Sequence, residues 1–212
     1  MFISIVFFLL AVLHIGILLF YSNIFLLTLI TKCLPTLYLV LYILDFKRKH
    51  PKLGINFFFW GLVFSLGGDF LLGLDNHLPN SFIYGLGSFL VAQICYSIAF
   101  SKGASLQLKK SIYFYLFGFL AFYYLYPALE KGLLIPVFIY MLALTTMAWR
   151  ASARKASANG VKLSTLGAVS FIISDAMLAF TKFRGLEIPF SQVWIMITYY
   201  LALYLLVQGF KK

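Results

Sequence analysis

Residues 54–74 read GINFFFWGLVFSLGGDFLLGL, and Asp69 is the one ionisable side chain in this stretch. A helix needs about 20 mostly apolar residues to cross a membrane, so the stretch predicts a transmembrane helix. The rest of the chain is similar, because 63% of its 212 residues are hydrophobic and only 11% are charged. That composition leaves too little polar surface for a soluble domain. We therefore predict an integral membrane protein.

Polar, glycine and proline breaks divide the chain into about eight stretches of this kind. We predict an all-α polytopic membrane protein with eight transmembrane helices in one bundle, forming a single domain over residues 1–212. The first stretch has no basic segment before it and no small-residue cleavage site, so we expect it to be a retained span and not a signal peptide. The expected spans lie near 2–21, 23–45, 54–74, 81–101, 110–127, 132–151, 160–182 and 188–210.

The chain carries 17 basic and six acidic residues, with a net charge of +11. The positive-inside rule explains this excess through topology and contact with anionic headgroups, so a nucleic-acid partner is not predicted. It also predicts that both termini are cytoplasmic. Thirteen of the basic residues fall in alternate connections or at the C-terminal end, namely Lys47, Arg48, Lys49, Lys52, Lys102, Lys109, Lys110, Arg150, Arg154, Lys155, Lys162, Lys211 and Lys212.

Four ionisable side chains fall inside the expected spans: His14, Lys32, Asp69 and Asp175, with Gln93 as a neutral polar neighbour. Each is costly in a bilayer unless it is paired or hydrated. The predicted topology places all four between mid-membrane and the non-cytoplasmic interface, which suggests one shared polar cavity. Lys32 could neutralise one aspartate in a structural ion pair. Because there are two acids and one base, one carboxyl would then have no basic partner. A pair of carboxyls suits general acid and base chemistry.

Several neighbours of these residues are candidate site residues. On the second expected span, Thr36 lies on the same stripe as Lys32, one helical turn further along. Thr36 is given no function, and the candidates are hydroxyl side chains beside the aspartates or on later spans: Ser65, Ser174, Tyr140, Tyr199 and Tyr200. The alternative for the serines is close helix packing, and the alternative for the tyrosines is packing or interfacial anchoring. We predict no metal site, because no spacing of His, Cys or carboxylates suggests one.

The two aspartates also suggest an internal duplication. The segment VFSLGGDFLLGL around Asp69 aligns with VSFIISDAMLAF around Asp175, 106 residues later. An offset near half the chain length predicts a parallel four-plus-four repeat, with one acid from each half.

Six segments resemble the YhhN-like family, the lysoplasmalogenases, in order and spacing over nearly the whole chain. The combination of FSLGGDFLL with the later SDAMLAFTKF is the most specific part. Two positions depart from the family pattern, Gln93 where His is common and Leu203 where Gln or His is frequent. The segments are TKCLPTLYLVLYIL, GLVFSLGGDFLLGL, YGLGSFLVAQICYSIAF, IPVFIYMLALTTMA, LGAVSFIISDAMLAFTKF and ITYYLALYLLVQG.

The resemblance implies an eight-span hydrolase of the vinyl-ether bond of lysoplasmalogens, with Asp69 and Asp175 as its catalytic carboxyls. It implies a lysophospholipid substrate and surrounding membrane lipids as partners, no cofactor, no nucleic acid and no inferable protein partner. The bacterial inner membrane is the expected location. Two alternatives stay open at the level of sequence. Embedded carboxylates with a lysine also suit a small proton-coupled transporter, and the departures at Gln93 and Leu203 leave room for a catalytically silent lipid-binding relative.

Overall fold

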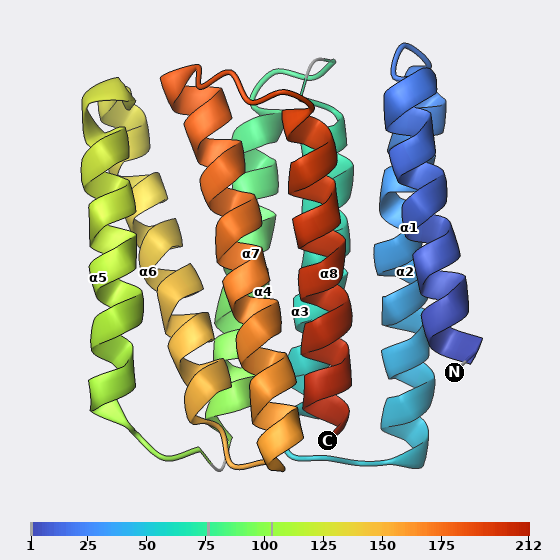
Figure 1. Ribbon diagram of the computed structural model, residues 1–212, viewed down its shortest axis with the longest axis vertical. Helices are drawn as coiled ribbons and strands as arrows, with labels where there is room; N and C mark the ends of the chain where they lie inside the picture. The colour runs from blue at the N-terminus through green and yellow to red at the C-terminus, as the bar shows by residue number, and fades with distance from the viewer. Residues whose placement is uncertain (1, 76, 103) are drawn as a thin grey trace. The chain divides into compact units, whose positions relative to one another are not determined.

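The structure, a computed structural model, describes residues 2–75, 77–102 and 104–212, which form helices joined by short connections (Figure 1). No β-strand occurs within these described ranges, so the predicted all-α fold class is confirmed. A short 3-10 helix, η1, lies between α5 and α6. The elements are α1 (Phe2–Phe20), α2 (Phe25–Lys49), α3 (Ile55–Gly73), α4 (Ser81–Ser101), α5 (Leu108–Leu125), η1 (Tyr126–Ala128), α6 (Lys131–Ala153), α7 (Ala158–Arg184) and α8 (Ser191–Lys211).

Seven of the helices described, all except α5, are long and apolar enough to cross a membrane. The prediction of a polytopic membrane protein is therefore confirmed. The helix α5 occupies the place of the fifth expected span, but its 18 residues include two lysines and four tyrosines. It is consequently less apolar than the others, and its role as an eighth span stays a prediction.

Two helices run past the expected spans into polar sequence. The helix α2 continues to Lys49, whose Nζ donates to Asp45 Oδ2 at 2.7 Å one turn earlier. This pair and the basic last turn both favour helix at its carboxyl end. The helix α7 reaches Arg184 and ends at Gly185, whose φ of 61° lies in the left-handed region that favours glycine.

The chain divides into two compact units, Met1–Tyr96 and Ser97–Lys212. In the first unit α1 packs on α2 and α2 packs on α3. In the second unit α5 packs on α6, α6 on α7, and α7 along α8. The division falls close to half the chain length, as the predicted repeat would require. The single domain over 1–212 stays a prediction.

The backbones of α7 and α8 approach closely at Gly167. A Cβ atom at this position would lie 2.8 Å from the backbone nitrogen of Leu206 and 2.9 Å from the carbonyl oxygen of Ala202. Backbone atoms cannot turn aside as a flexible side chain can. Glycine therefore permits this packing, which is the usual function of small residues between membrane helices.

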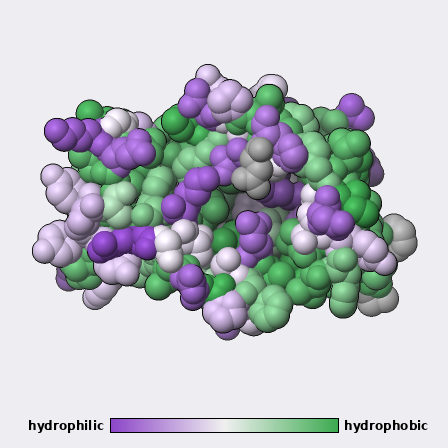
Figure 2. Space-filling model, turned by 90° about the horizontal axis from the view of Figure 1, so that it is seen from above, coloured by the Kyte–Doolittle hydropathy of each residue, from purple (hydrophilic) through white to green (hydrophobic). Residues whose placement is uncertain are grey.

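Large apolar side chains cover the outward faces of the helices. On α5 the side chains of Ile112, Tyr113, Leu116, Leu120 and Tyr123 are all more than half exposed. A continuous apolar face of this kind would be unusual in water and is what a helix presents to lipid. Figure 2 shows one end of the molecule, where hydrophilic residues lie among hydrophobic ones, as expected at a membrane surface.

Replacing Gly167 by alanine should destabilise the protein. Extra volume in a tight helix contact costs about 1–3 kcal/mol, so Gly167→Ala should lower the Tm of the detergent-solubilised protein. Gly87→Ala on α4 is the matched control, because nothing lies within 4 Å of a Cβ at that position. There alanine favours helix by up to about 1 kcal/mol, and the Tm should be unchanged or higher. Equal melting temperatures for the two variants would contradict the packing described.

Candidate functional site

Asp69 lies in the interior of the first unit, on α3, with its side chain 1% exposed. Thr36 on α2 is fully buried beside it, and its Oγ1 donates a hydrogen bond of 2.6 Å to Asp69 Oδ2. Short hydrogen bonds from a hydroxyl to a carboxylate are among the stronger ones in proteins. The helix α2 thus provides a donor for a carboxyl that would otherwise be costly to bury.

Lys32 lies one turn before Thr36 on the same face of α2. Its ammonium group is close enough to Asp69 and Asp75 to attract both electrostatically. The structure therefore brings Lys32 and Asp69 together, as the sequence analysis expected. It adds Asp75, which follows α3, to the acidic groups that act on this lysine.

His14 reaches the same region from α1 and is 1% exposed. Its Nδ1 lies 3.0 Å from the hydroxyl oxygen of Thr31. The Thr31 hydroxyl also donates to the Leu27 carbonyl at 2.7 Å. The positive charge of Lys32 also acts on this ring, so His14 belongs to the same polar group.

The face of α3 below Asp69 packs on α4. Ser65 and Tyr96 are fully buried, and their hydroxyl oxygens lie 3.1 Å apart. The Tyr96 ring occupies the space that a Cβ at Gly61 would need. Gln93 is fully buried three residues before Tyr96 and four after Phe89, which packs on α3 in the same way. Gln93 therefore lies on the face of α4 that packs against α3.

Asp175 belongs to the second unit, on α7, and is partly exposed. Tyr140 on α6 is buried and donates a hydrogen bond of 2.5 Å from its hydroxyl to Asp175 Oδ2. The neighbouring Ser174 donates to the carbonyl oxygen of Ile195 on α8 at 3.0 Å. Tyr140 thus lies against the predicted carboxyl, whereas Ser174 joins α7 to α8.

Tyr199 and Tyr200 are buried on α8. The Tyr199 ring meets the Phe171 ring of α7 edge to face, with 5.5 Å between the ring centroids, and its centroid lies 5.7 Å from that of Tyr200. Leu203, one turn further along α8, is fully buried. These side chains form an aromatic and apolar contact within the second unit.

The two units hold their carboxyls in the same way. Each aspartate accepts a hydrogen bond from a hydroxyl on the preceding helix, Thr36 of α2 for Asp69 and Tyr140 of α6 for Asp175. The shared arrangement agrees with the predicted four-plus-four repeat. Asp69 and Asp175 belong to different units, so a cavity shared between them stays a prediction.

Sequence reasoning missed the role of Thr36. It placed Thr36 on one stripe with Lys32 but gave it no function, and the structure shows that it is the donor to Asp69. The available signal was its spacing of one turn from the lysine.

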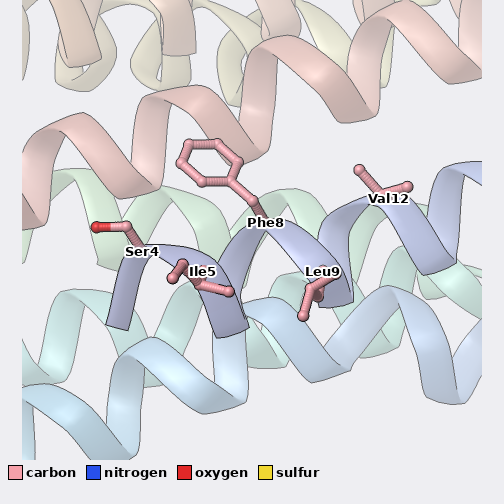
Figure 3. Close-up of a pocket in the computed structure, with 5 residues that line it drawn as sticks. All are labelled: Ser4, Ile5, Phe8, Leu9 and Val12. Carbon is pink, nitrogen blue, oxygen red and sulfur yellow. The ribbon is translucent and has the colours of Figure 1, made fainter. Parts of the chain in front are cut away.

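Figure 3 shows a shallow apolar depression lined by side chains of α1 alone: Ser4, Ile5, Phe8, Leu9 and Val12. It contains none of the predicted site residues and suits contact with lipid tails. Throughout 2–75, 77–102 and 104–212, no group of three His, Cys, Asp or Glu side chains lies close enough together to hold a metal ion.

Fold and site together define a polytopic α-helical membrane protein with two carboxyl side chains, each bound by a hydroxyl of a neighbouring helix. The chain belongs to the YhhN family, whose sequence model matches residues 27–210. The resemblance found in the sequence is therefore confirmed.

Three animal proteins illustrate the similarity. The chain is 36% identical to lysoplasmalogenase TMEM86A of Homo sapiens over 181 residues, which are 81% of this chain and 72% of that protein. It is 34% identical to lysoplasmalogenase TMEM86A of Bos taurus over the same shares. It is 30% identical to lysoplasmalogenase TMEM86B of Sus scrofa over 175 residues, 82% of this chain and 70% of that protein. No solved structure matches the chain.

Removing the Thr36 hydroxyl should destabilise the first unit. Thr36→Val keeps the shape but leaves Asp69 without this donor, which should cost about 1–3 kcal/mol and lower the Tm in detergent. Thr36→Ser, which keeps the hydroxyl, should restore most of the loss. Thr145→Val is a buried control, since the Thr145 hydroxyl donates only to carbonyls of its own helix. An equal loss in Thr36→Val and Thr145→Val would argue against a specific role for the hydrogen bond to Asp69.

Proposed function

We propose that the protein is a lysoplasmalogenase, a membrane hydrolase that cleaves the vinyl-ether bond of an alkenyl lysophospholipid. The observation that carries the proposal is the identity of 36% over 81% of the chain with a protein named lysoplasmalogenase. The buried, hydroxyl-bound Asp69 beside Lys32 supplies groups suited to that chemistry. The products are a fatty aldehyde and a glycerophospho-choline or glycerophospho-ethanolamine.

The reaction begins with proton transfer to carbon. A carboxylic acid protonates the outer alkene carbon of the vinyl ether, which leaves an oxocarbenium ion at the carbon bound to oxygen. Water adds to that cation and loses a proton, which gives a hemiacetal. The hemiacetal collapses to the aldehyde and the glycerol hydroxyl. Glycoside hydrolysis uses similar steps, with one carboxyl as acid and a second that stabilises the cation or activates water.

Asp69 is proposed as the carboxylate that stabilises the cation or activates water, because the positive charge of Lys32 favours its ionised form. The hydrogen bond from Thr36 also favours the carboxylate and fixes its orientation. Thr36 is accordingly a positioning residue, and Lys32 provides electrostatic support or contacts the substrate phosphate.

Asp175 is proposed as the proton donor, with Tyr140 holding its orientation. His14 and Gln93 are proposed as polar neighbours of Asp69 that assist water or substrate binding. No cofactor is part of the proposed reaction. The substrate is amphipathic, so its alkenyl tail can enter between helices while its headgroup stays at the membrane surface.

Aldehyde release should depend on both carboxyls. With purified protein in detergent and a 1-alkenyl lysophospholipid, Asp69→Asn and Asp175→Asn should each lower the rate by at least about 10²-fold, the usual size of an acid–base contribution. The saturated 1-alkyl ether should not be cleaved, because it has no alkene to protonate.

Asp45→Asn is the matched control, since it makes the same chemical change at an exposed carboxylate paired with Lys49. Its rate should equal that of the wild type. Full activity in both Asp69→Asn and Asp175→Asn would refute the assigned residues. A folded wild type that releases no aldehyde would refute the proposed activity.

We further propose that both termini are cytoplasmic and that the protein resides in a bacterial inner membrane. The basis is the concentration of basic residues in alternate connections. In a bacterial host, a green fluorescent protein fused to the C-terminal end should therefore fluoresce, and alkaline phosphatase fused at the same point should be inactive. The opposite pattern would place the C-terminal end on the non-cytoplasmic side and refute the proposed topology.

A further inference from the structure

Two arginines lie where α6 ends, in the second unit. Arg150 is in the last turn of α6 and is 8% exposed, and Arg154 follows the helix and is half-buried. Both were counted among the basic residues that signal topology. Arg150 lies within the expected span 132–151 and within α6, and the structure shows that its side chain is packed.

The two guanidinium groups are held in place by neutral partners. Arg150 Nε donates to the Ser101 hydroxyl at 2.7 Å, and one terminal nitrogen donates to the Ser105 carbonyl at 3.4 Å. Arg154 donates to the Ser164 hydroxyl at 3.0 Å and to the Phe210 carbonyl at 3.4 Å. These bonds join the end of α4, the start of α7 and the end of α8, which lie together at the bottom of Figure 1.

Aromatic rings complete the surroundings. The Arg150 guanidinium lies 5.0 Å from the Trp149 ring centroid. The Arg154 guanidinium lies 5.4 Å from the centroid of Phe100 and 5.3 Å from that of Phe210. Burial lowers the pKa of Arg154 to about 10, so the group stays charged at neutral pH. Tryptophan favours the headgroup level of a membrane, so Trp149 suggests that the arginines lie at that depth.

The second unit has no acidic side chain at this end. Its three acidic side chains are Glu130, Asp175 and Glu187. At about 1.5 Å per residue, Glu130 is about 30 Å from Arg150 along α6, and Asp175 is about 26 Å from the start of α7. Glu187 lies beyond the far end of α7. No salt bridge joins either arginine to a carboxylate in the part of the chain that the structure describes.

Both guanidinium groups retain hydrogen-bonding capacity. A guanidinium has five N–H groups, and the described protein uses two of them in Arg150 and two in Arg154. A phosphate oxygen pair matches the fork of a guanidinium, which an amine does not.

We propose that Arg150 and Arg154 form a binding site for the phosphate of an anionic membrane lipid, at the end of the second unit where α6 meets α4, α7 and α8. The arginines are held rigidly, lack an acidic partner and lie at headgroup depth, which is what recognition of a lipid phosphate requires. The site is separate from Asp175 of the same unit, and the proposal does not depend on the proposed hydrolase activity.

Thermal unfolding of the full chain in neutral detergent tests the proposal. Phosphatidylglycerol should raise the Tm by several degrees, because a ligand that binds only the folded state stabilises it. Phosphatidylcholine, whose headgroup is neutral overall, should give a much smaller rise. Arg154→Gln and Arg150→Gln should each lose most of the phosphatidylglycerol shift. If Arg150→Gln does not fold, Arg150→Lys is the second variant. It keeps the positive charge but lacks the paired N–H donors of a guanidinium, and it should also lose most of the Tm rise with phosphatidylglycerol.

The double variant Lys155→Gln with Lys162→Gln is the matched control, since it removes two exposed charges from the same end and should keep the shift. Three results would overturn the proposal. The first is an equal rise with phosphatidylcholine in the wild type, and the second is a full phosphatidylglycerol shift in the arginine variants. The third is an equal rise with inorganic phosphate alone, which would identify a soluble phosphate as the ligand.

Discussion

The cost of a carboxyl group inside a membrane governs the structure around Asp69. Such a group must find donors within the protein, because lipid offers none. The short bond from Thr36 and the nearby charge of Lys32 meet that need from one face of α2. Glycines at 61 and 68 on α3 then let aromatic rings of α4 pack close by, which keeps the carboxyl buried. The residues of α2, α3 and α4 that surround Asp69 thus meet the requirements of one buried carboxyl group.

The sequence predicted the helices well because spans are long and apolar, and their ends are marked by polar residues and glycine. The grouping of Lys32 with Asp69 was also predictable, since both are too costly to bury alone. The donor role of Thr36 and the hydrogen bond between Tyr140 and Asp175 were not, because they depend on the rotation of one helix against another. The packing of Arg150 was not predictable either, because a charged residue at the end of a span gives the same sequence pattern whether its side chain is solvated or packed.

Both units supply a hydroxyl donor to an aspartate, but they use different side chains. Threonine provides the hydroxyl in the first unit, and tyrosine provides it in the second. Tyrosine is longer, so α6 can supply the donor without bringing its backbone as close to α7. Asp175 is partly exposed where Asp69 is not. The two carboxyls therefore have unequal environments, which would suit them to the different tasks proposed for them.

The contacts of Arg154 affect how the protein is made. Its bond to the Phe210 carbonyl joins residues 56 apart in the sequence, whereas Thr36 and Asp69 are 33 apart. A membrane protein is synthesised from its N-terminus, and its domains can pack as they emerge. The first unit can therefore assemble while later helices are still in the ribosome. In the second unit, Arg154 must remain without its bond to Phe210 until α8 is inserted, so this end of the protein is the last to mature.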